Sequence, residues 1–153
     1  MSHYSELLQY IKTLAESDDM VHTVTKGTIN DVDLEKFNIY PLVHIDIDSG
    51  TFSNGNTILF NVDLACLDIR DINNEIDDSK FWSNDNEVDN HNVTHAILNR
   101  IWTAMYRDFE SNNITASENP TIQKITYGKT NLLDGWVLSF AVEMPNTKLN
   151  LCQ

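Results

Sequence analysis

The first apolar stripe of the chain predicts an amphipathic helix close to the N-terminus. Its members recur at intervals of three and four, which places them on one helical face: Tyr4, Leu7, Leu8, Ile11 and Leu14. Ser2 is a suitable N-cap, because its hydroxyl can accept a hydrogen bond from a backbone N–H of the first turn. We expect this helix to end near residues 17–19, where the sequence reads Ser-Asp-Asp.

A second and stronger stripe predicts a long helix that ends at about residue 110. Its apolar members also follow helical spacing: Leu98, Ile101, Trp102, Met105 and Phe109. Residues 83–85 offer capping side chains, and Glu87 stands three residues after Asn84, which is the spacing of a capping box. The polar segment 111–120 should end the helix.

Two strands joined as a hairpin are predicted between these helices. Residues 39–48 alternate apolar and polar side chains, and Pro41 should lie at the start or edge of the strand because it cannot donate to a ladder. Residues 57–70 form a longer strand with one apolar face: Ile58, Phe60, Val62, Leu64 and Cys66. The cluster SGTFSNGN at 49–56 is typical of a turn, so we expect a loop of about eight residues.

Three further strands complete the prediction. Residues 20–28 are rich in β-branched side chains, whereas 30–38 read as a turn or one short helical piece. The strands at 121–127 and 136–142 are joined across 128–135. The order α-β-β-β-α-β-β favours a single α+β domain over residues 1–153, with a largely antiparallel sheet and two main helices packed on it.

The charge of the chain restricts its partners. The sequence carries 23 acidic and 10 basic residues, a net charge of −13. Such a surface repels phosphate, so stable nucleic-acid binding is not expected, although a DNA mimic or the lining of a DNA passage would tolerate this charge. No apolar run is long enough to cross a membrane, and no signal peptide is evident. With only Cys66 and Cys152, we expect no disulfide framework.

The string HNVTH at 91–95 resembles the H-E-x-x-H pattern of zinc peptidases, in which two histidines lie on one helical face. Asn92 replaces the glutamate that acts as general base in those enzymes, and it cannot accept a proton near neutral pH. The three-histidine variant fails as well, because Leu98 and Ile101 occupy the positions of its glycine and third histidine. We therefore predict no catalytic residues, no cofactor and no enzyme.

Non-catalytic metal ligands remain conceivable at two places. His91 and His95 could be joined by Glu110 or Glu118. Three alternate strand residues would also share a face: His44, Asp46 and Asp48. We prefer the simpler interpretations, in which His91 and His95 are polar first-turn residues at the edge of the apolar stripe and the three strand residues point outward, and we predict no metal.

The order of elements and several strings resemble the tail-terminator and tail-completion proteins of tailed bacteriophages. The strings are IYPLVHIDID, TILFNVDLACLDIRD and NLLDGWVLSFAVEMP, and the resemblance covers roughly residues 4–146. Its most specific parts are the Y-P-L-x-H strand opening and the D-G-W strand. The resemblance implies an α+β virion subunit that assembles with itself into a ring, commonly a hexamer, without a catalytic signature. That ring caps the tail tube protein and meets the head–tail connector protein.

We therefore expect a virion protein of the tail or neck, assembled in the cytoplasm of the bacterial host. The subunit interface should lie in two long polar segments, the hairpin tip and the acidic connection before the second helix. Their predicted contact residues are Ser49, Thr51, Phe52, Asn54, Asn56, Asp71, Asn74 and Asp77. The alternatives are another neck or tail structural protein, a monomeric acidic inhibitor or DNA mimic, and a metal-binding domain that uses His91 and His95.

Overall fold

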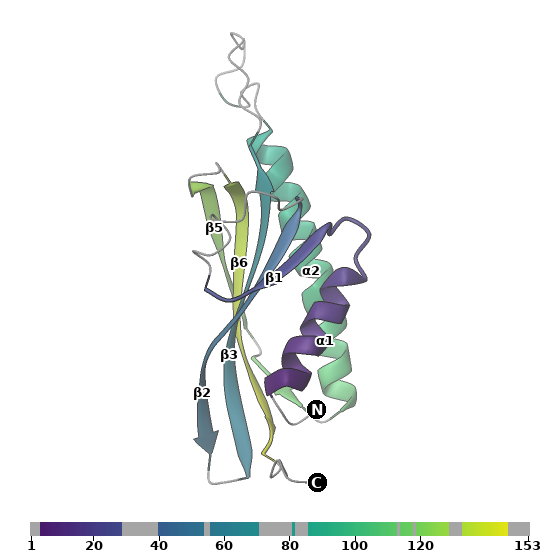
Figure 1. The fold of residues 1–153 in the computed structure, drawn as a ribbon, viewed down its shortest axis with the longest axis vertical. Helices are drawn as coiled ribbons and strands as arrows, with labels where there is room; N and C mark the ends of the chain where they lie inside the picture. Colours follow the sequence, from purple (N-terminus) through teal and green to yellow (C-terminus); the bar gives the residue numbers. More distant parts are fainter. Residues whose placement is uncertain are drawn as a thin grey trace.

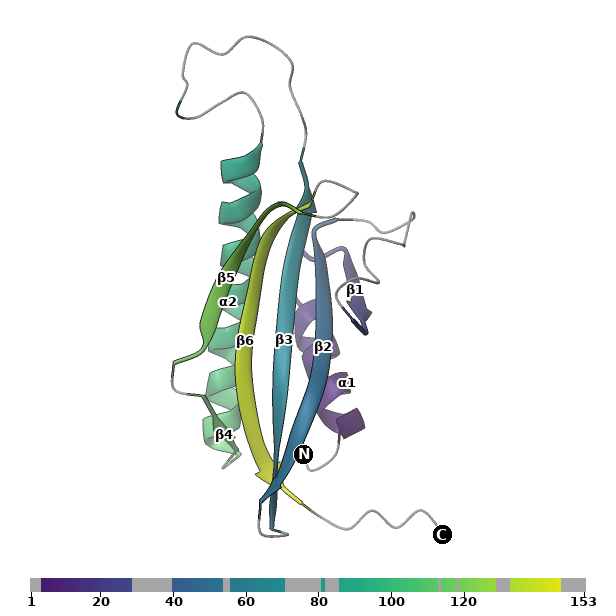
Figure 2. The ribbon, with the colours of Figure 1, turned by 90° about the vertical axis from the view of Figure 1, so that its left-hand side faces the viewer.

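A six-stranded sheet carries two helices on one of its faces (Figures 1 and 2). The structure is a computed structural model. The residues that it describes are 4–28, 40–53, 56–70, 81, 86–112, 114–117, 119–128 and 133–146. Along the chain the elements are α1 (Tyr4–Glu16), β1 (Thr23–Lys26), β2 (Leu42–Ser53), β3 (Thr57–Ile69), α2 (Glu87–Ser111), β4 (Thr115–Ala116), β5 (Thr121–Gly128) and β6 (Leu133–Pro145).

The sheet is mainly antiparallel, as the sequence predicted. Its strands lie in the order β1-β2-β3-β6-β4, and β5 also pairs with β6, beside the half of that strand nearer its start. Only the pairing of β1 with β2 is parallel among these strands. The predicted α+β class and the predicted order are confirmed, with the two-residue strand β4 as an addition. The predicted turn or short helix at 30–38 lies outside the described residues.

The two helices cover one face of the sheet (Figure 2). Helix α1 buries Leu7, Ile11 and Ala15 against β1 and β2, while α2 packs on β3 and β6. Helix α2 begins at Glu87 with Asn86 as N-cap, and Asn86 makes no capping bond with its side chain. The predicted capping box was therefore wrong, because Glu87 is the first helical residue rather than the third.

The main core fills the space between the helices and the sheet. It contains Val62, Leu64 and Cys66 of the predicted apolar face, with Ile58 and Phe60 packed partly buried beside them. Phe109 and Phe140 are buried, whereas Trp102 and Trp136 are only partly buried at its margin. Cys66 is a free thiol inside this core, and its burial raises its pKa. Cys152 lies outside the described residues.

Truncating a core aromatic gives a direct test of this packing. The Phe109 side chain is 1% exposed, so Phe109→Ala should leave a cavity and lower the free energy of unfolding by about 3–5 kcal/mol. Phe52→Ala is the matched control, since Phe52 is 73% exposed. Urea unfolding followed by circular dichroism would measure both changes. A cost for Phe109→Ala no larger than that of the control would contradict this core assignment.

One end of the sheet is buried on both faces. On the face away from the helices, a second cluster of buried residues contains Leu42, Ala65, Leu67 and Leu133. Tyr40, Ile125 and Val137 pack against it, partly buried. This is why apolar residues in β3 stop alternating after Leu64, where the run Ala65-Cys66-Leu67 is buried throughout. Burial on both faces removes the period of two on which strand prediction depends.

The hairpin loop is shorter than the sequence predicted. Strand β2 continues through Ser53, and its pairing with β3 extends to Ser53 opposite Thr57. The register shifts between Ile47 and Ser49, so Asp48 forms a bulge. Prediction failed here because both faces of this end are polar or exposed, which removes the apolar signal while backbone pairing continues.

Candidate functional site

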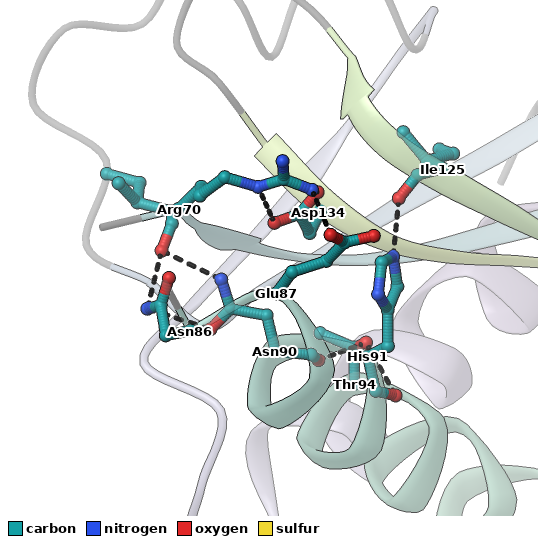
Figure 3. A network of polar contacts seen from close by, with 9 residues as sticks. Arg70, Asn86, Glu87, Asn90, His91, Thr94, Ile125 and Asp134 are labelled. Atoms are coloured by element: carbon teal, nitrogen blue, oxygen red, sulfur yellow. Dashed lines mark hydrogen bonds and ion pairs between the residues drawn. The ribbon is translucent and has the colours of Figure 1, made fainter. Parts of the chain in front are cut away.

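The two histidines of HNVTH lie beside an indole ring. The Nε2 atom of His91 is 2.9 Å from the carbonyl oxygen of Ile125 (Figure 3). The rings of His91 and His95 lie edge-on to Trp136, with centroid distances of 6.0 and 5.7 Å. Trp136 also donates its indole N–H to the carbonyl of His91 at 3.0 Å. Both imidazoles therefore help to fix the start of β6 against α2.

His91 lies deeper than the position at the edge of the apolar stripe that the sequence suggested for both histidines. It is buried, whereas His95 is exposed. The expected acidic third ligands do not join them: Glu110 lies five turns further along α2 on its exposed surface, and Glu118 lies outside the described residues. Within the described ranges, no group of three His, Cys, Asp or Glu side chains is arranged to hold a metal ion.

His44 was predicted to face solvent, and this was wrong. Its side chain is 1% exposed, and its Nδ1 lies 2.7 Å from the Thr25 hydroxyl while Nε2 lies 2.8 Å from the carbonyl oxygen of Gly27. These two contacts link β2 to β1. Asp46 is half-buried and Asp48 is exposed in the bulge, so the three residues do not form one ligand face.

A buried ion pair joins the end of β3 to the start of β6 (Figure 3). Arg70 donates from Nε and Nη2 to the two carboxylate oxygens of Asp134, at 2.8 and 2.7 Å. The Arg70 side chain is 10% exposed and that of Asp134 is fully buried. Glu87 adds a third charge 3.4 Å from Arg70, at the first residue of α2. The cluster thus ties two strands to one helix.

Asparagines at the start of α2 extend this cluster. The side-chain amides of Asn86 and Asn90 both donate to the carbonyl of Ile69, at 3.3 and 2.9 Å. Asn90 is buried, so this bond satisfies a polar group that would otherwise be costly to bury. Together with Arg70, these contacts fix the helix start where the expected side-chain cap is missing (Figure 3).

The D-G-W string has a structural explanation at all three positions. Asp134 forms the ion pair, and Trp136 makes T-shaped contacts with both imidazoles. Gly135 pairs with Leu67, and a Cβ placed on it would lie 1.9 Å from the carbonyl oxygen of Cys66. All three residues belong to strand β6, which begins at Leu133, three residues before the predicted start. Sequence reasoning noted this string as a resemblance but assigned Asp134 and Gly135 no role.

Asp68 lies close to this cluster, opposite Asp134 in the pairing of β3 with β6. Partial burial raises the pKa of its carboxyl above the ordinary value, an effect opposed by the Ile69 N–H bond and by His22 and reinforced by Asp134. The ionised carboxylate is therefore less favourable in the folded chain than in the unfolded chain. Its cost to stability is present near neutral pH, decreases as the pH falls through the raised pKa, and is gone below the ordinary aspartate pKa.

Asp68→Asn should consequently raise the melting temperature at pH 7, because it removes a carboxylate that folding disfavours. The gain should vanish in acid, below the ordinary aspartate pKa of 3.8, where the parent side chain is already neutral in both states. Calorimetry across this pH range would measure it, with the exposed Asp19→Asn as control. A gain that persists unchanged in acid would show that the effect is not ionisation.

The end of the β2–β3 hairpin is the most exposed part of the sheet. Residues 48–53 of β2 are all exposed, and they include a large apolar side chain, that of Phe52. β1 pairs with β2 only from Leu42 to Ile45, so the remaining edge of β2 is unpaired within the described residues. A strand edge of this kind is available to another chain.

Half of the predicted interface residues can be placed. Ser49, Thr51 and Phe52 lie in the exposed part of β2, and Asn56 lies in the turn before β3. The Asn56 carbonyl accepts a bond from the Asn146 N–H at 2.9 Å, which holds the turn to the end of β6. The other predicted residues lie outside the described ranges: Asn54, Asp71, Asn74 and Asp77.

No helix among the described residues is both long and apolar enough to cross a membrane. Comparison of the chain with protein-family models gives no match, and a search of curated proteins also gives none.

Proposed function

We propose that the chain is a structural virion protein of a tailed phage, a subunit of the ring that ends the tail tube and joins it to the head-side connector. The observation that carries this proposal is the exposed hairpin end. This end of the hairpin extends beyond the helices (Figures 1 and 2). It presents an open strand edge and carries Phe52, which is 73% exposed. Aromatic side chains, phenylalanine among them, are enriched in the cores of protein interfaces.

The hairpin suits a ring better than a two-fold dimer. A rigid projection that contacts a different surface on the next copy is a heterologous contact, and such contacts generate rings when the rotation closes. The likeness of residues 4–146 to tail-terminator proteins supports the same reading. Further partners on this proposal are the tail tube protein and the connector protein.

The charge of the chain is consistent with a passage for DNA. With a net charge of −13, an assembled ring would repel the phosphate backbone and let the genome move through without binding. The ring therefore needs no stable nucleic-acid site, and no catalytic step enters this role. Assembly in the bacterial cytoplasm also suits a chain with one buried free thiol among its described residues.

Two measurements test this role. Light scattering during size-exclusion chromatography should find a closed oligomer at raised protein concentration, and electron microscopy of particles labelled for this protein should find it at the head end of the tail. A chain that stays monomeric at every concentration and is absent from particles would reject the ring. Tight one-to-one capture of a DNA-binding protein by that monomer would instead favour the acidic inhibitor.

A further inference from the structure

A groove of about 430 Å³ lies between α1 and β1. Leu8, Val24 and Ile45 supply its apolar lining. Lys12 and Lys26 line it as well, and both are exposed. Lys12 also contacts Glu16 at 2.9 Å, but an exposed ion pair of this spacing on a helix is weak and does not prevent Lys12 from contacting a partner. The groove therefore combines an apolar floor with two available cationic side chains.

The positive charge of this groove is unusual for the molecule. Within the described ranges the chain has three lysines, of which Lys12 and Lys26 line the groove and Lys124 lies on β5. Of the arginines in the same ranges, Arg100 on α2 and Arg70 just after β3 are paired with aspartates, and Arg107 is exposed on α2. A partner for this groove should accordingly be acidic and carry an exposed apolar side chain.

The hairpin of the same chain has that chemistry. Residues 42–69 contain four aspartates and no lysine or arginine. Phe52 and Asp48 are both exposed in the outer half of β2. The phenyl ring of Phe52 could contact the apolar floor of the groove, and the carboxylate of Asp48 could contact its lysines. Charge complementarity of this kind guides two surfaces together and fixes their register.

A hairpin cannot reach the groove of its own subunit. Pairing from Ser49 through Ser53 with β3 holds the strand extended. In Figure 1 the hairpin ends below the N-terminus of α1, whereas β1 lies well above that level. The occupant must therefore be the hairpin of another copy.

We infer that the hairpin end of one copy docks in the α1–β1 groove of a second copy, with Phe52 on the apolar floor and Asp48 facing Lys12 and Lys26. This contact rests on the proposed ring and names the two surfaces that would build it. Because the hairpin and the groove are different surfaces of one chain, each subunit donates a hairpin to one neighbour and receives one from the other.

Two variants of the full-length chain each block one of the surfaces. Phe52→Asp would place a charge against the apolar floor in place of the phenyl ring, and it leaves the groove intact. The double variant Lys12→Glu/Lys26→Glu reverses the charge of the groove and leaves the hairpin intact. All three side chains are exposed, so folding should be retained, which circular dichroism would verify. Each variant alone should self-associate at least tenfold more weakly than the parent.

Mixing the two blocked variants gives the decisive measurement. One intact groove and one intact hairpin remain across the pair, so the mixture should form a heterodimer that cannot grow into a ring. Native mass spectrometry distinguishes these species when one variant carries an isotope label. A mixture that stays monomeric would overturn the inference, because it would show that the hairpin and groove do not meet.

Two control variants test whether a change of charge or polarity outside the two proposed surfaces also weakens self-association. Lys124→Glu reverses an exposed lysine on β5, and Ile122→Asp adds a carboxylate at another exposed apolar residue. Both should assemble like the parent. If the parent forms rings and the blocked variants do so equally well, the docking inference fails and the proposed ring stands. If the parent never assembles and is absent from particles, the ring itself fails.

Discussion

Gly135→Ala should destabilise the fold by about 3 kcal/mol or more, at the upper end of what overpacking costs. The added methyl group would lie 1.9 Å from the carbonyl oxygen of Cys66 and 3.0 Å from the Cα of Leu67. Both are backbone atoms of the paired strand β3, so no side-chain rotation can relieve the overlap. The strands would have to separate at the point where β6 begins.

Gly50→Ala is the matched control in the same sheet. A Cβ at Gly50 would lie 3.1 Å from a ring atom of Phe60 and 3.3 Å from the carbonyl oxygen of Leu59. Small shifts at this exposed end of the hairpin can absorb such contacts, so a loss of under 1 kcal/mol is expected. Denaturant unfolding of the two variants provides the comparison. Equal stability of Gly135→Ala and the parent would mean that β6 does not approach β3 this closely.

Asp134→Ala should cost about 3–5 kcal/mol, because it leaves the Arg70 guanidinium buried without its main counter-charge. Two hydrogen bonds to Arg70 are lost, at 2.8 and 2.7 Å. The remaining carboxylate, that of Glu87, lies 3.4 Å from Arg70 and belongs to a partly exposed side chain. Thermal and chemical unfolding should both register the loss.

Asp18→Ala provides a counterpart in which the arginine is exposed. Asp18 accepts two hydrogen bonds from Arg100; the Asp18 side chain is 8% exposed but that of Arg100 is 47% exposed, so the cation that the substitution leaves unpaired stays hydrated. Removal of the Asp18 carboxylate should cost no more than about 1 kcal/mol. The double variant Arg70→Met/Asp134→Leu should recover most of the stability lost in Asp134→Ala, since it removes both buried charges together. Similar costs for Asp134→Ala and Asp18→Ala would contradict the burial of the Arg70 pair.

The elements with one buried face were predictable from the sequence. Alternation located β2, β3 and most of β6, and helical spacing located α1 and α2, because each of these has one side in the core. Prediction failed where that condition did not hold. The outer half of β2 is exposed on both faces, and the run from Ala65 to Leu67 is buried on both, so neither carries a period of two.

Side-chain partners far apart in the sequence were not predictable. Arg70 and Asp134 are separated by 64 positions, and nothing in the local pattern of either indicates the other. His44 has the spacing of an outward polar residue, yet Thr25 and Gly27 supply both of its polar contacts from another strand. Lys12 and Lys26 come together in one groove only because α1 lies against β1. These contacts depend on which elements lie side by side, and the local pattern of the sequence does not reveal that.

The pairing of β3 with β6 also determines the order in which the chain can fold during synthesis. β2 and β3 are adjacent in the sequence and can pair early, but β6 emerges from the ribosome long after them, with Thr57 finally opposite Pro145. Contacts this distant in sequence close slowly. Until β6 arrives, the second edge of β3 is unpaired beside its apolar run from Leu64 to Leu67. Nascent chains of this protein should therefore be chaperone clients and prone to aggregation until residues 133–145 have been made.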